Sequence, residues 1–386
     1  LGEQKPREEC GVFAVWAPEE DVAKLTFYGL FALQHRGQEA AGIAVGDGHQ
    51  TIVFKDLGLV NQVFDEQTLQ AMRGNVAIGH TRYSTTGATT WENAQPMFRS
   101  IGEDTGVALA HNGNLVNTTA LKRRAVQLGI MPENELAGCA SDTDVVASLL
   151  AHTAVNGGLE EAALHLLPKV EGAFCFVMCD TDTIYAARDP YGVRPLSLGR
   201  LDRGWVVASE TCALDIVGAS YVRDIEPGEF VTINATGVHS RRFAEPRHAR
   251  CVFEHVYLAR PDSFLNGRSV NAARVEIGRS LAREHPCDGD LVIPVPESGT
   301  PAAVGYAQES GIPFAQGLTK NSYVGRTFIQ PSQTIRQLGI RLKLNPLREV
   351  IRGKRLVVVD DSIVRGNTQR ALVSMLREAG AAEVHA

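Results

Sequence analysis

The stretch RLVVVDDSIVRGNTQRALVSMLREAGA, residues 355–381, carries the clearest local pattern in the chain. Its apolar run 357–359 predicts a buried strand that ends at two adjacent aspartates, Asp360 and Asp361. A short loop, 362–368, contains one glycine, and a helix is expected from about Gln369 with Thr368 as its N-cap. The expected buried face of that helix consists of Leu372, Met375, Leu376 and Ala379, and Gly380 ends it.

This strand, loop and helix form a phosphate-binding pattern. The backbone N–H groups of the loop and the positive end of the helix dipole both favour an anion. A site for phosphate alone has no use for two carboxylates, whereas ribose hydroxyls or a Mg²⁺ ion do. The pattern therefore indicates a phosphorylated sugar. The alternative is a strand end with solvated carboxylates.

Around this stretch, residues 250–386 read as a domain with a mainly parallel sheet. The run DLVIPVP (290–296) is short and almost entirely apolar, and a helical pattern covers 268–284. Strands buried on both faces of a parallel sheet have this composition. The polar, basic segment 241–250 reads as a linker.

Residues 10–240 show a different pattern, in which short strand-like runs are separated by Gly, Asn and Asp. Helical spacing occurs in two stretches, 21–36 and 142–153, of which the second follows a capping string, SDTD. In the first, the predicted buried face holds Val22, Leu25, Tyr28, Gly29 and Ala32. Many strands with few helices between them predict antiparallel sheets packed face to face.

Composition excludes several classes of partner. The net charge of −6 gives no general attraction to nucleic acid or anionic membranes, and no apolar run approaches a membrane span of about 20 residues. Residues 320–355 hold nine Lys or Arg against one acid, but few aromatics, which favours a pyrophosphate-bearing small molecule over nucleic acid. Seven cysteines without CxxC pairs fit a reduced, cytoplasmic chain.

Cys10, in REECGVFAVW (7–16), stands at the start of a predicted buried strand. It is either a core cysteine behind a frayed end or a nucleophile exposed by removal of residues 1–9 as a propeptide. An N-terminal cysteine supplies both a thiol and a base, because its free α-amine has a reference pKa of about 7.7–8.0.

Four further strings favour the nucleophile. Taken singly, QHRGQ (34–38), HTRYST (80–85), HNGN (111–114) and SDTD (141–144) read as turns, surface arginines or caps. Together they supply what hydrolysis of the glutamine amide needs. An amide and a backbone N–H can bind an oxyanion, a guanidinium can hold a carboxylate, and a carboxylate can hold an ammonium group.

Two family resemblances follow from these strings. VVVDDSIVRGNT (357–368) resembles the phosphoribosyl pyrophosphate (PRPP) signature of type I phosphoribosyltransferases. This implies ribose binding by the paired aspartates, Mg²⁺ near them and near Ser298 of a pyrophosphate loop (292–303), and a closing loop at 318–329. The PRPP-binding residues implied are Lys320, Tyr323, Arg326, Asp360, Asp361, Ser362, Arg365, Gly366, Asn367 and Thr368.

The N-terminal strings resemble class II glutamine amidotransferases, which are N-terminal nucleophile (Ntn) hydrolases with a four-layer α+β sandwich. The resemblance implies Cys10 as nucleophile and an oxyanion hole at Asn112 and Gly113. The implied glutamine-binding residues are Arg36, Arg82 and Asp142.

The combination resembles glutamine-dependent amidotransferases that act on PRPP. It implies transfer of ammonia to PRPP with release of pyrophosphate, the first step of purine synthesis, in a homotetramer inhibited by purine nucleotides. Relatives with a propeptide tend to carry a [4Fe–4S] cluster, and Cys251 aligns with its first ligand. Because the sequence given stops at Ala386, the second domain is expected to be incomplete and the other cluster cysteines to be missing. Two alternatives remain: a class II amidotransferase with another acceptor, and a PRPP- or nucleotide-binding regulatory protein without catalysis.

Overall fold

The computed structural model describes residues 10–83, 90–102, 105–136, 141–321, 343–363 and 366–386. Within these ranges the chain divides into two compact units. The N-terminal unit extends to Val252 and also includes Ser263–Gly267, and the C-terminal unit comprises Phe253–Asp262 and Arg268–Ala386. Each unit is described by itself.

The N-terminal unit contains two antiparallel sheets. The first has seven strands in the order β11-β9-β10-β1-β4-β2-β3, and the second has six in the order β13-β12-β8-β7-β6-β5. The first sheet consists of β1 (Gly11–Trp16), β2 (Ala40–Gly46), β3 (Thr51–Leu57), β4 (Val76–Arg82), β9 (Ser197–Leu201), β10 (Gly204–Ala208) and β11 (Ser220–Asp224). The second consists of β5 (Met97–Ile101), β6 (Thr105–Leu115), β7 (Gly172–Cys179), β8 (Ile184–Arg188), β12 (Glu229–Asn234) and β13 (Gly237–Arg242).

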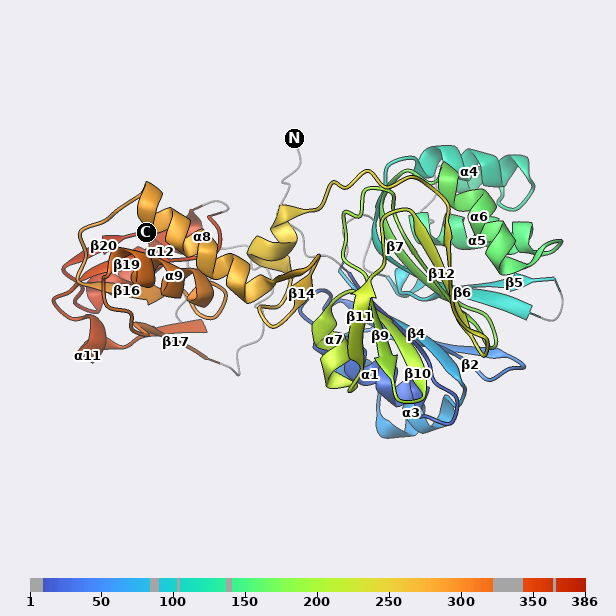
Figure 1. The fold of residues 1–386 in the computed structure, drawn as a ribbon, viewed down its shortest axis with the longest axis horizontal. Coiled ribbons are helices and arrows are strands. Elements are labelled where there is room, and N and C mark those ends of the chain that lie inside the picture. Colours follow the sequence, from blue (N-terminus) through green and yellow to red (C-terminus); the bar gives the residue numbers. More distant parts are fainter. Residues whose placement is uncertain (1–9, 84–89, 103–104, 137–140, 322–342, 364–365) are drawn as a thin grey trace. The chain divides into compact units, whose positions relative to one another are not determined.

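Helices cover the outer face of each sheet, so that this unit has four layers (Figure 1). The first sheet is covered by α1 (Val22–Ala32), α2 (Val60–Val63), α3 (Glu66–Ala71) and α7 (Thr211–Ile216). The second is covered by α4 (Thr118–Gln127), α5 (Asp142–Ala154) and α6 (Gly158–Leu166). The predicted sandwich of antiparallel sheets is confirmed, with more helices than the two that the sequence predicted.

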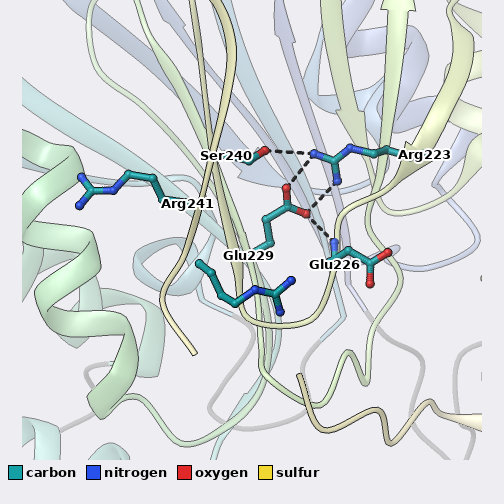
Figure 2. Close-up of a pocket in the computed structure, with 6 residues that line it drawn as sticks. Arg223, Glu226, Glu229, Ser240 and Arg241 are labelled. Atoms are coloured by element: carbon teal, nitrogen blue, oxygen red, sulfur yellow. Dashed lines mark hydrogen bonds and ion pairs between the residues drawn. The ribbon is translucent and has the colours of Figure 1, made fainter. Parts of the chain in front are cut away.

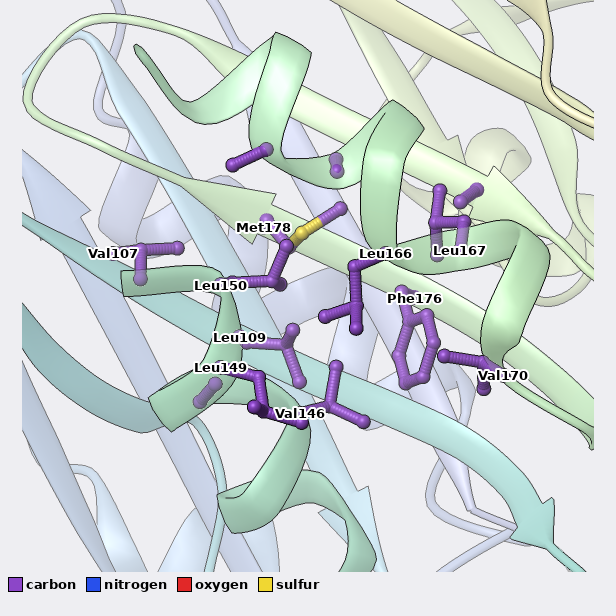
Figure 3. Packing of buried hydrophobic residues seen from close by; sticks show 14 of the residues in the cluster. Val107, Leu109, Val146, Leu149, Leu150, Leu166, Leu167, Val170, Phe176 and Met178 are labelled. Carbon is purple, nitrogen blue, oxygen red and sulfur yellow. The ribbon is translucent and has the colours of Figure 1, made fainter. Parts of the chain in front are cut away.

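Strand β1 shows why the layers form. Its side chains alternate between the two faces of the sheet. Val12 and Ala14 pack between the sheets, whereas Phe13 and Val15 pack under the helices. On the far side, Phe176 and Met178 of β7 and Leu150 of α5 belong to a third apolar cluster (Figure 3).

Helix α1 corrects one detail of the predicted buried face. Val22, Gly29 and Ala32 are buried as expected, but 41% of the surface of Tyr28 is exposed. Gly29 is required where it lies, because a Cβ atom there would overlap the ring of Phe13. The close approach of helix and sheet at Gly29, rather than a continuous apolar stripe, therefore determines how α1 packs.

The C-terminal unit is built on three parallel strands in the order β16-β19-β20. These are β16 (Leu291–Pro294), β19 (Arg355–Val359) and β20 (Glu383–His385), and β17 (Leu318–Lys320) pairs separately with β18 (Leu344–Pro346). Its helices include α8 (Val270–Glu284), α9 (Thr300–Ser310), α11 (Arg348–Ile351) and α12 (Asn367–Glu378). The predicted parallel sheet is confirmed.

Helix α12 buries the predicted face of Leu372, Met375, Leu376 and Ala379. Its start was predicted wrongly, because the N-cap is Gly366 and not Thr368. Gly366 has φ +69°, a left-handed conformation that glycine adopts without steric cost. The helix therefore begins two residues closer to the aspartates than the sequence indicated.

Candidate active site

Cys10 lies at the entrance of β1 and is buried. Its Sγ is 3.6 Å from the carbonyl oxygen of Tyr83, which follows the end of β4. Strand β4 pairs with β1, with Gly11 opposite Thr81, so the sheet brings the thiol beside Arg82. Cys175 and Cys179, by contrast, pack fully buried between the sheets, as predicted. Burial raises the pKa of Cys175 to about 12, which suits a core thiol and not a nucleophile.

Arg36 connects the loop after α1 to Cys10. Its Nε donates to the carbonyl oxygen of Cys10 at 3.1 Å, and its Nη1 donates to Glu210 at 2.7 Å. The next residue, Gly37, is packed so tightly on β4 that a Cβ atom would lie 2.5 Å from the carbonyl carbon of Thr81. The QHRGQ string therefore folds onto the sheet and holds the Cys10 backbone in place.

Glu210 is a site residue that the sequence analysis missed. It is fully buried, and its Oε1 lies 2.7 Å from both Nη1 of Arg36 and Nε2 of His35. Its Oε2 accepts a hydrogen bond from the hydroxyl of Ser263 at 2.7 Å. Burial alone would raise the pKa of Glu210, but His35, Arg36 and Ser263 together hold it below the usual range. Glu210 therefore stays ionised and neutralises Arg36.

Arg82 lies almost fully buried, at 5% exposure. Its Nη1 donates to the carbonyl oxygen of Asn93 at 2.6 Å, whereas its buried Nε has no partner among the described residues. A buried guanidinium with an unused donor suits an incoming carboxylate. The position agrees with the glutamine-carboxylate role that the sequence predicts for this arginine.

Asn112 and Gly113 lie on β6, opposite Cys175 and Phe174 of β7. Asn112 is fully buried, and its Oδ1 has no partner in the described part of the chain. Gly113 has φ +150°, and a Cβ atom there would overlap the carbonyl oxygen of Ala173. Only glycine fits at this point.

Asp142 begins α5, which Ser141 caps as predicted. One oxygen of Asp142 accepts from the N–H of Leu115 at 3.2 Å and lies 3.7 Å from Nδ1 of His111. Burial would raise the pKa of Asp142, but His111 and the backbone hydrogen bonds lower it to about 2. The carboxylate is thus ionised at neutral pH and suits an ammonium group.

A chain of short polar contacts joins these residues. Gln95 accepts from the N–H of His111 at 2.7 Å and donates to Thr143 at 3.0 Å. His80 lies 3.1 Å from the carbonyl oxygen of His111, and burial followed by the charge of Arg82 lowers its pKa to about 3. His80 is therefore a neutral donor to that carbonyl.

Lys55 of β3 supports the segment that holds Arg82. Its Nζ donates to the carbonyl oxygen of Ala94 at 2.5 Å and lies over the ring of Trp91, while Trp91 donates to the Lys55 carbonyl at 3.0 Å. Burial, then Arg99, lowers the pKa of Lys55 to about 8. Lys55 does not stand out in the sequence, and His80 was noted only as part of the string HTRYST, because the role of each depends on partners on other strands.

In the C-terminal unit, β19 ends at Asp360 and Asp361. Burial, followed by the charge of Asp361, raises the pKa of Asp360 to about 6. Asp360 accepts from Nε2 of Gln369 at 2.7 Å, and Asp361 accepts from the hydroxyl of Ser362 at 2.8 Å. The carboxylates, Gly366 and the first turn of α12, which includes Thr368, thus lie at one end of the parallel sheet. Arg365 and the side chain of Asn367 lie outside the described residues.

The predicted pyrophosphate loop reaches the same end of the sheet. Gly299 is packed so closely that a Cβ atom would lie 2.5 Å from the carbonyl oxygen of Val359. Ser298, beside it, is partly exposed. Lys320, at the end of β17, lies 3.8 Å from Glu297 of this loop. Tyr323 and Arg326 lie outside the described residues, as does the leader 1–9.

Metal sites were tested against the donor atoms present. No group of three or more His, Cys, Asp or Glu side chains able to hold a metal occurs in the described ranges. The paired carboxylates of Asp360 and Asp361 suit Mg²⁺, because burial and then the charge of Asp361 raise the pKa of Asp360, and a divalent cation would offset both effects. Cys251 is partly exposed, and four thiolates are needed for a [4Fe–4S] cluster, so the described residues do not fit one.

A separate pocket of about 400 Å³ lies among Arg223, Glu226, Glu229, Ser240 and Arg241 (Figure 2). Glu229 is paired with Arg223 there through two contacts of 2.7 and 2.8 Å. This pocket shares no residue with the candidate sites.

The fold and the two sites define the class of protein: a glutamine amidotransferase unit followed by a phosphoribosyltransferase unit. Comparison with known proteins agrees. Residues 80–215 match the glutamine amidotransferase domain, and residues 271–386 match the phosphoribosyl transferase domain.

Whole-chain comparisons identify the family. The chain is 75% identical to the amidophosphoribosyltransferase of Mycobacterium tuberculosis over 98% of its own length and 72% of that protein. It is 47% identical to the enzyme of Bacillus subtilis, over 98% of this chain and 78% of that protein. The solved B. subtilis glutamine PRPP amidotransferase, complexed with ADP and GMP, matches with a TM-score of 0.89 at 46% identity, over 97% of this chain and 80% of that one. The chain belongs to the amidophosphoribosyltransferase family.

Proposed function

We propose that glutamine is hydrolysed at Cys10 and that the released ammonia displaces pyrophosphate from PRPP at the C-terminal site. The observation that carries the first half is a cluster of unmet hydrogen-bonding groups beside Cys10. His80, Arg82, His111 and Asn112 each have a buried polar atom with no partner among the described residues. Native proteins pair more than about 90% of such groups, so the cluster favours a polar ligand that supplies the missing partners.

In the first step, the glutamine carboxylate would pair with Arg82 and its ammonium group with Asp142. The α-amine of Cys10 would take the thiol proton as Sγ attacks the side-chain amide. The amide of Asn112 and the N–H of Gly113 would bind the oxyanion, and the amine would return the proton to the departing ammonia. Water then hydrolyses the thioester and releases glutamate.

In the second step, ammonia would attack C1 of the PRPP ribose and pyrophosphate would leave, giving 5-phosphoribosylamine. Asp360 and Asp361 would accept hydrogen bonds from the ribose hydroxyls. The start of α12, with Ser362, Arg365, Gly366, Asn367 and Thr368, would hold the 5-phosphate. Lys320, Tyr323 and Arg326 would stabilise the departing pyrophosphate.

A bound Mg²⁺ would supply charge neutralisation to the pyrophosphate, with Asp360, Asp361 and Ser298 as the residues nearest to it. The [4Fe–4S] cluster remains an expectation that rests on Cys251 and the family resemblance alone, and no step depends on it.

Further parts of the proposal concern organisation and regulation. We assign 1–9 to a propeptide, 10–240 to the amidotransferase domain and 250–386 to the phosphoribosyltransferase domain. Purine nucleotides are proposed inhibitors, because the B. subtilis relative was solved with ADP and GMP. Homotetramer formation rests on the family resemblance alone, and a cytoplasmic location rests on the cysteine pattern of the sequence. Among the helices described, none has both the length and the apolar character to cross a membrane.

The test compares Cys10→Ala with the parent, both prepared without residues 1–9, and uses two assays. Glutamate release should be lost in the variant, whereas synthesis from PRPP and added ammonium should remain. A parent that keeps residues 1–9 should release no glutamate, because its Cys10 nitrogen is an amide without a basic lone pair. Glutamate release by Cys10→Ala at the parental rate would overturn the assignment of Cys10 as the nucleophile. Turnover of another phosphosugar in place of PRPP would favour a different class II amidotransferase, and absence of both activities in the parent would favour a regulatory protein.

A further inference from the structure

Ser209 follows the end of β10 and is fully buried. Its hydroxyl oxygen accepts a hydrogen bond from the backbone N–H of Val12 at 2.9 Å, and its own N–H donates to the Val12 carbonyl at 3.0 Å. The same hydroxyl oxygen lies 3.5 Å from the side-chain nitrogen of Asn112. Ser209 thus contacts both the nucleophile strand, two residues after Cys10, and the residue proposed for the oxyanion hole.

With the Asn112 amide in that orientation, two hydrogen-bonding groups at Ser209 and Asn112 have no partner among the described residues. A hydroxyl has one proton to give and two lone pairs that accept. Here the Ser209 hydroxyl accepts from Val12 and from Asn112, so its own proton has no acceptor among the described residues. Oδ1 of Asn112, also buried, likewise has no partner in the described ranges. Two unmet groups therefore lie on adjacent side chains.

A rotation of the Asn112 amide group by half a turn gives both unmet groups a hydrogen-bond partner. The oxygen and nitrogen of an amide are distinguished by their hydrogen-bond partners. After the half-turn, the Ser209 hydroxyl donates to Oδ1 of Asn112 while it still accepts from Val12. The NH₂ group then occupies the position that has no protein partner, where an oxyanion formed at the Cys10 thioester can accept from it.

We propose that Ser209 is a positioning residue for glutamine hydrolysis, whose hydroxyl fixes the Asn112 side chain with its NH₂ group directed at the oxyanion. The inference rests on the proposed oxyanion role of Asn112. Ser209 itself does not touch the substrate, and it acts through Asn112.

The test is a double-mutant cycle on the protein with Cys10 at its N-terminus, read out as kcat and KM for glutamate release. Asn112→Ala should lower kcat by about 10²–10³, the usual cost of one oxyanion donor. Ser209→Ala should lower kcat by about tenfold, with KM changed less than about twofold, because the donor remains but loses its orientation. In the Asn112→Ala background, Ser209→Ala should cost less than about twofold.

Ser197→Ala is the matched control, since Ser197 is also fully buried in the first sheet and its hydroxyl donates one hydrogen bond, to Asp224 at 3.0 Å. It should leave kcat unchanged. If Ser209→Ala does not fold, Ser209→Cys, which keeps a side chain of similar size with a weaker donor, replaces it in the cycle.

The outcomes separate this inference from the proposed function. A full tenfold loss from Ser209→Ala in the Asn112→Ala background would mean that Ser209 acts through Val12 instead, and would overturn the inference. Parental activity in Ser209→Ala, beside a strong loss in Asn112→Ala, would overturn the inference alone. Parental activity in Asn112→Ala would overturn the oxyanion role and, with it, the inference.

Discussion

Replacement of Glu210 by glutamine should destabilise the N-terminal unit more than any comparable change of a surface ion pair. The side chain of Arg36 is 1% exposed, and its Nη1 lies 2.7 Å from the fully buried carboxylate of Glu210. Removing one member of a buried ion pair costs about 3–5 kcal/mol. Because glutamine keeps one acceptor oxygen, we expect the low end, about 3 kcal/mol.

Tryptophan fluorescence gives a direct assay. The three tryptophans, Trp16, Trp91 and Trp205, all lie in the N-terminal unit, so the signal follows this unit alone. With a urea m-value of about 3 kcal/mol/M, a loss of about 3 kcal/mol lowers the unfolding midpoint by about 1 M. Glutamate release should fall as well, since Arg36 holds the Cys10 carbonyl.

Glu229→Gln is the matched control. Glu229 pairs with Arg223 through two short contacts, but the Arg223 side chain is 37% exposed (Figure 2). Such a pair contributes about 0.2–1 kcal/mol, so the midpoint should shift by less than about 0.3 M. Equal shifts in the two variants would refute the reasoning from burial.

The pH dependence provides a second readout for Glu210. Its pKa is held below the usual glutamate range, so its stabilisation is complete above that range and is lost as the pH falls through the lowered value. The difference in midpoint between parent and Glu210→Gln should therefore be largest near neutral pH and shrink in acid. A difference that grows in acid would contradict the assigned cause.

Three further changes test other parts of the two sites. The pKa of Asp360 is about 6, so PRPP binding measured by calorimetry should weaken as the pH falls through 6. Asp360→Asn, which leaves Asp361 in place, should remove that pH dependence. The same pH dependence of binding in the variant would count against the role of Asp360. The pKa of Lys55 is lowered to about 8, so the stability of the folded protein should rise with pH between about pH 8 and 10, where Lys55 is neutral only in the folded state. The urea midpoint of Lys55→Met should change less with pH over that window than the parental midpoint. Equal pH curves for the two proteins would reject this role of Lys55. Gly113→Ala should lower glutamate release at least about 100-fold while ammonium-dependent synthesis persists, because the added methyl overlaps the β7 backbone; equal losses in both assays would indicate general misfolding.

Local patterns predicted the elements of the fold well where the residues that decide them are neighbours in sequence. The strand 355–359 and the buried face of α12 follow from apolar spacing, and the Ser141 cap from the residue type alone. The start of α12 was missed because a left-handed Gly366 can replace a side-chain cap, which spacing does not reveal. Tyr28 was misassigned because a glycine beside a phenylalanine ring decides how α1 sits.

The predicted nucleophile Cys10 and the predicted glutamine-binding residues stood out because each lies in a short string of unusual composition. Ser209 and Glu210 did not, since serine and glutamate after a strand are ordinary residues. Their role arises from the strand order β10-β1-β4, which brings residue 209 beside residue 12 across nearly two hundred positions of sequence. No local pattern encodes that pairing.

Hydrogen-bond accounting nevertheless separates the two kinds of residue. Glu210 is buried with a partner for each oxygen, so it needs no ligand and belongs to the support of the site. Arg82 and Asn112 are also buried, and each keeps a polar atom without a partner among the described residues. Leaving such an atom unpaired costs about 1–3 kcal/mol, and a folded protein tolerates that cost most readily where a ligand removes it. Under the proposed function, unmet groups therefore mark the surface expected to bind glutamine, and fully paired groups mark the residues that support this surface.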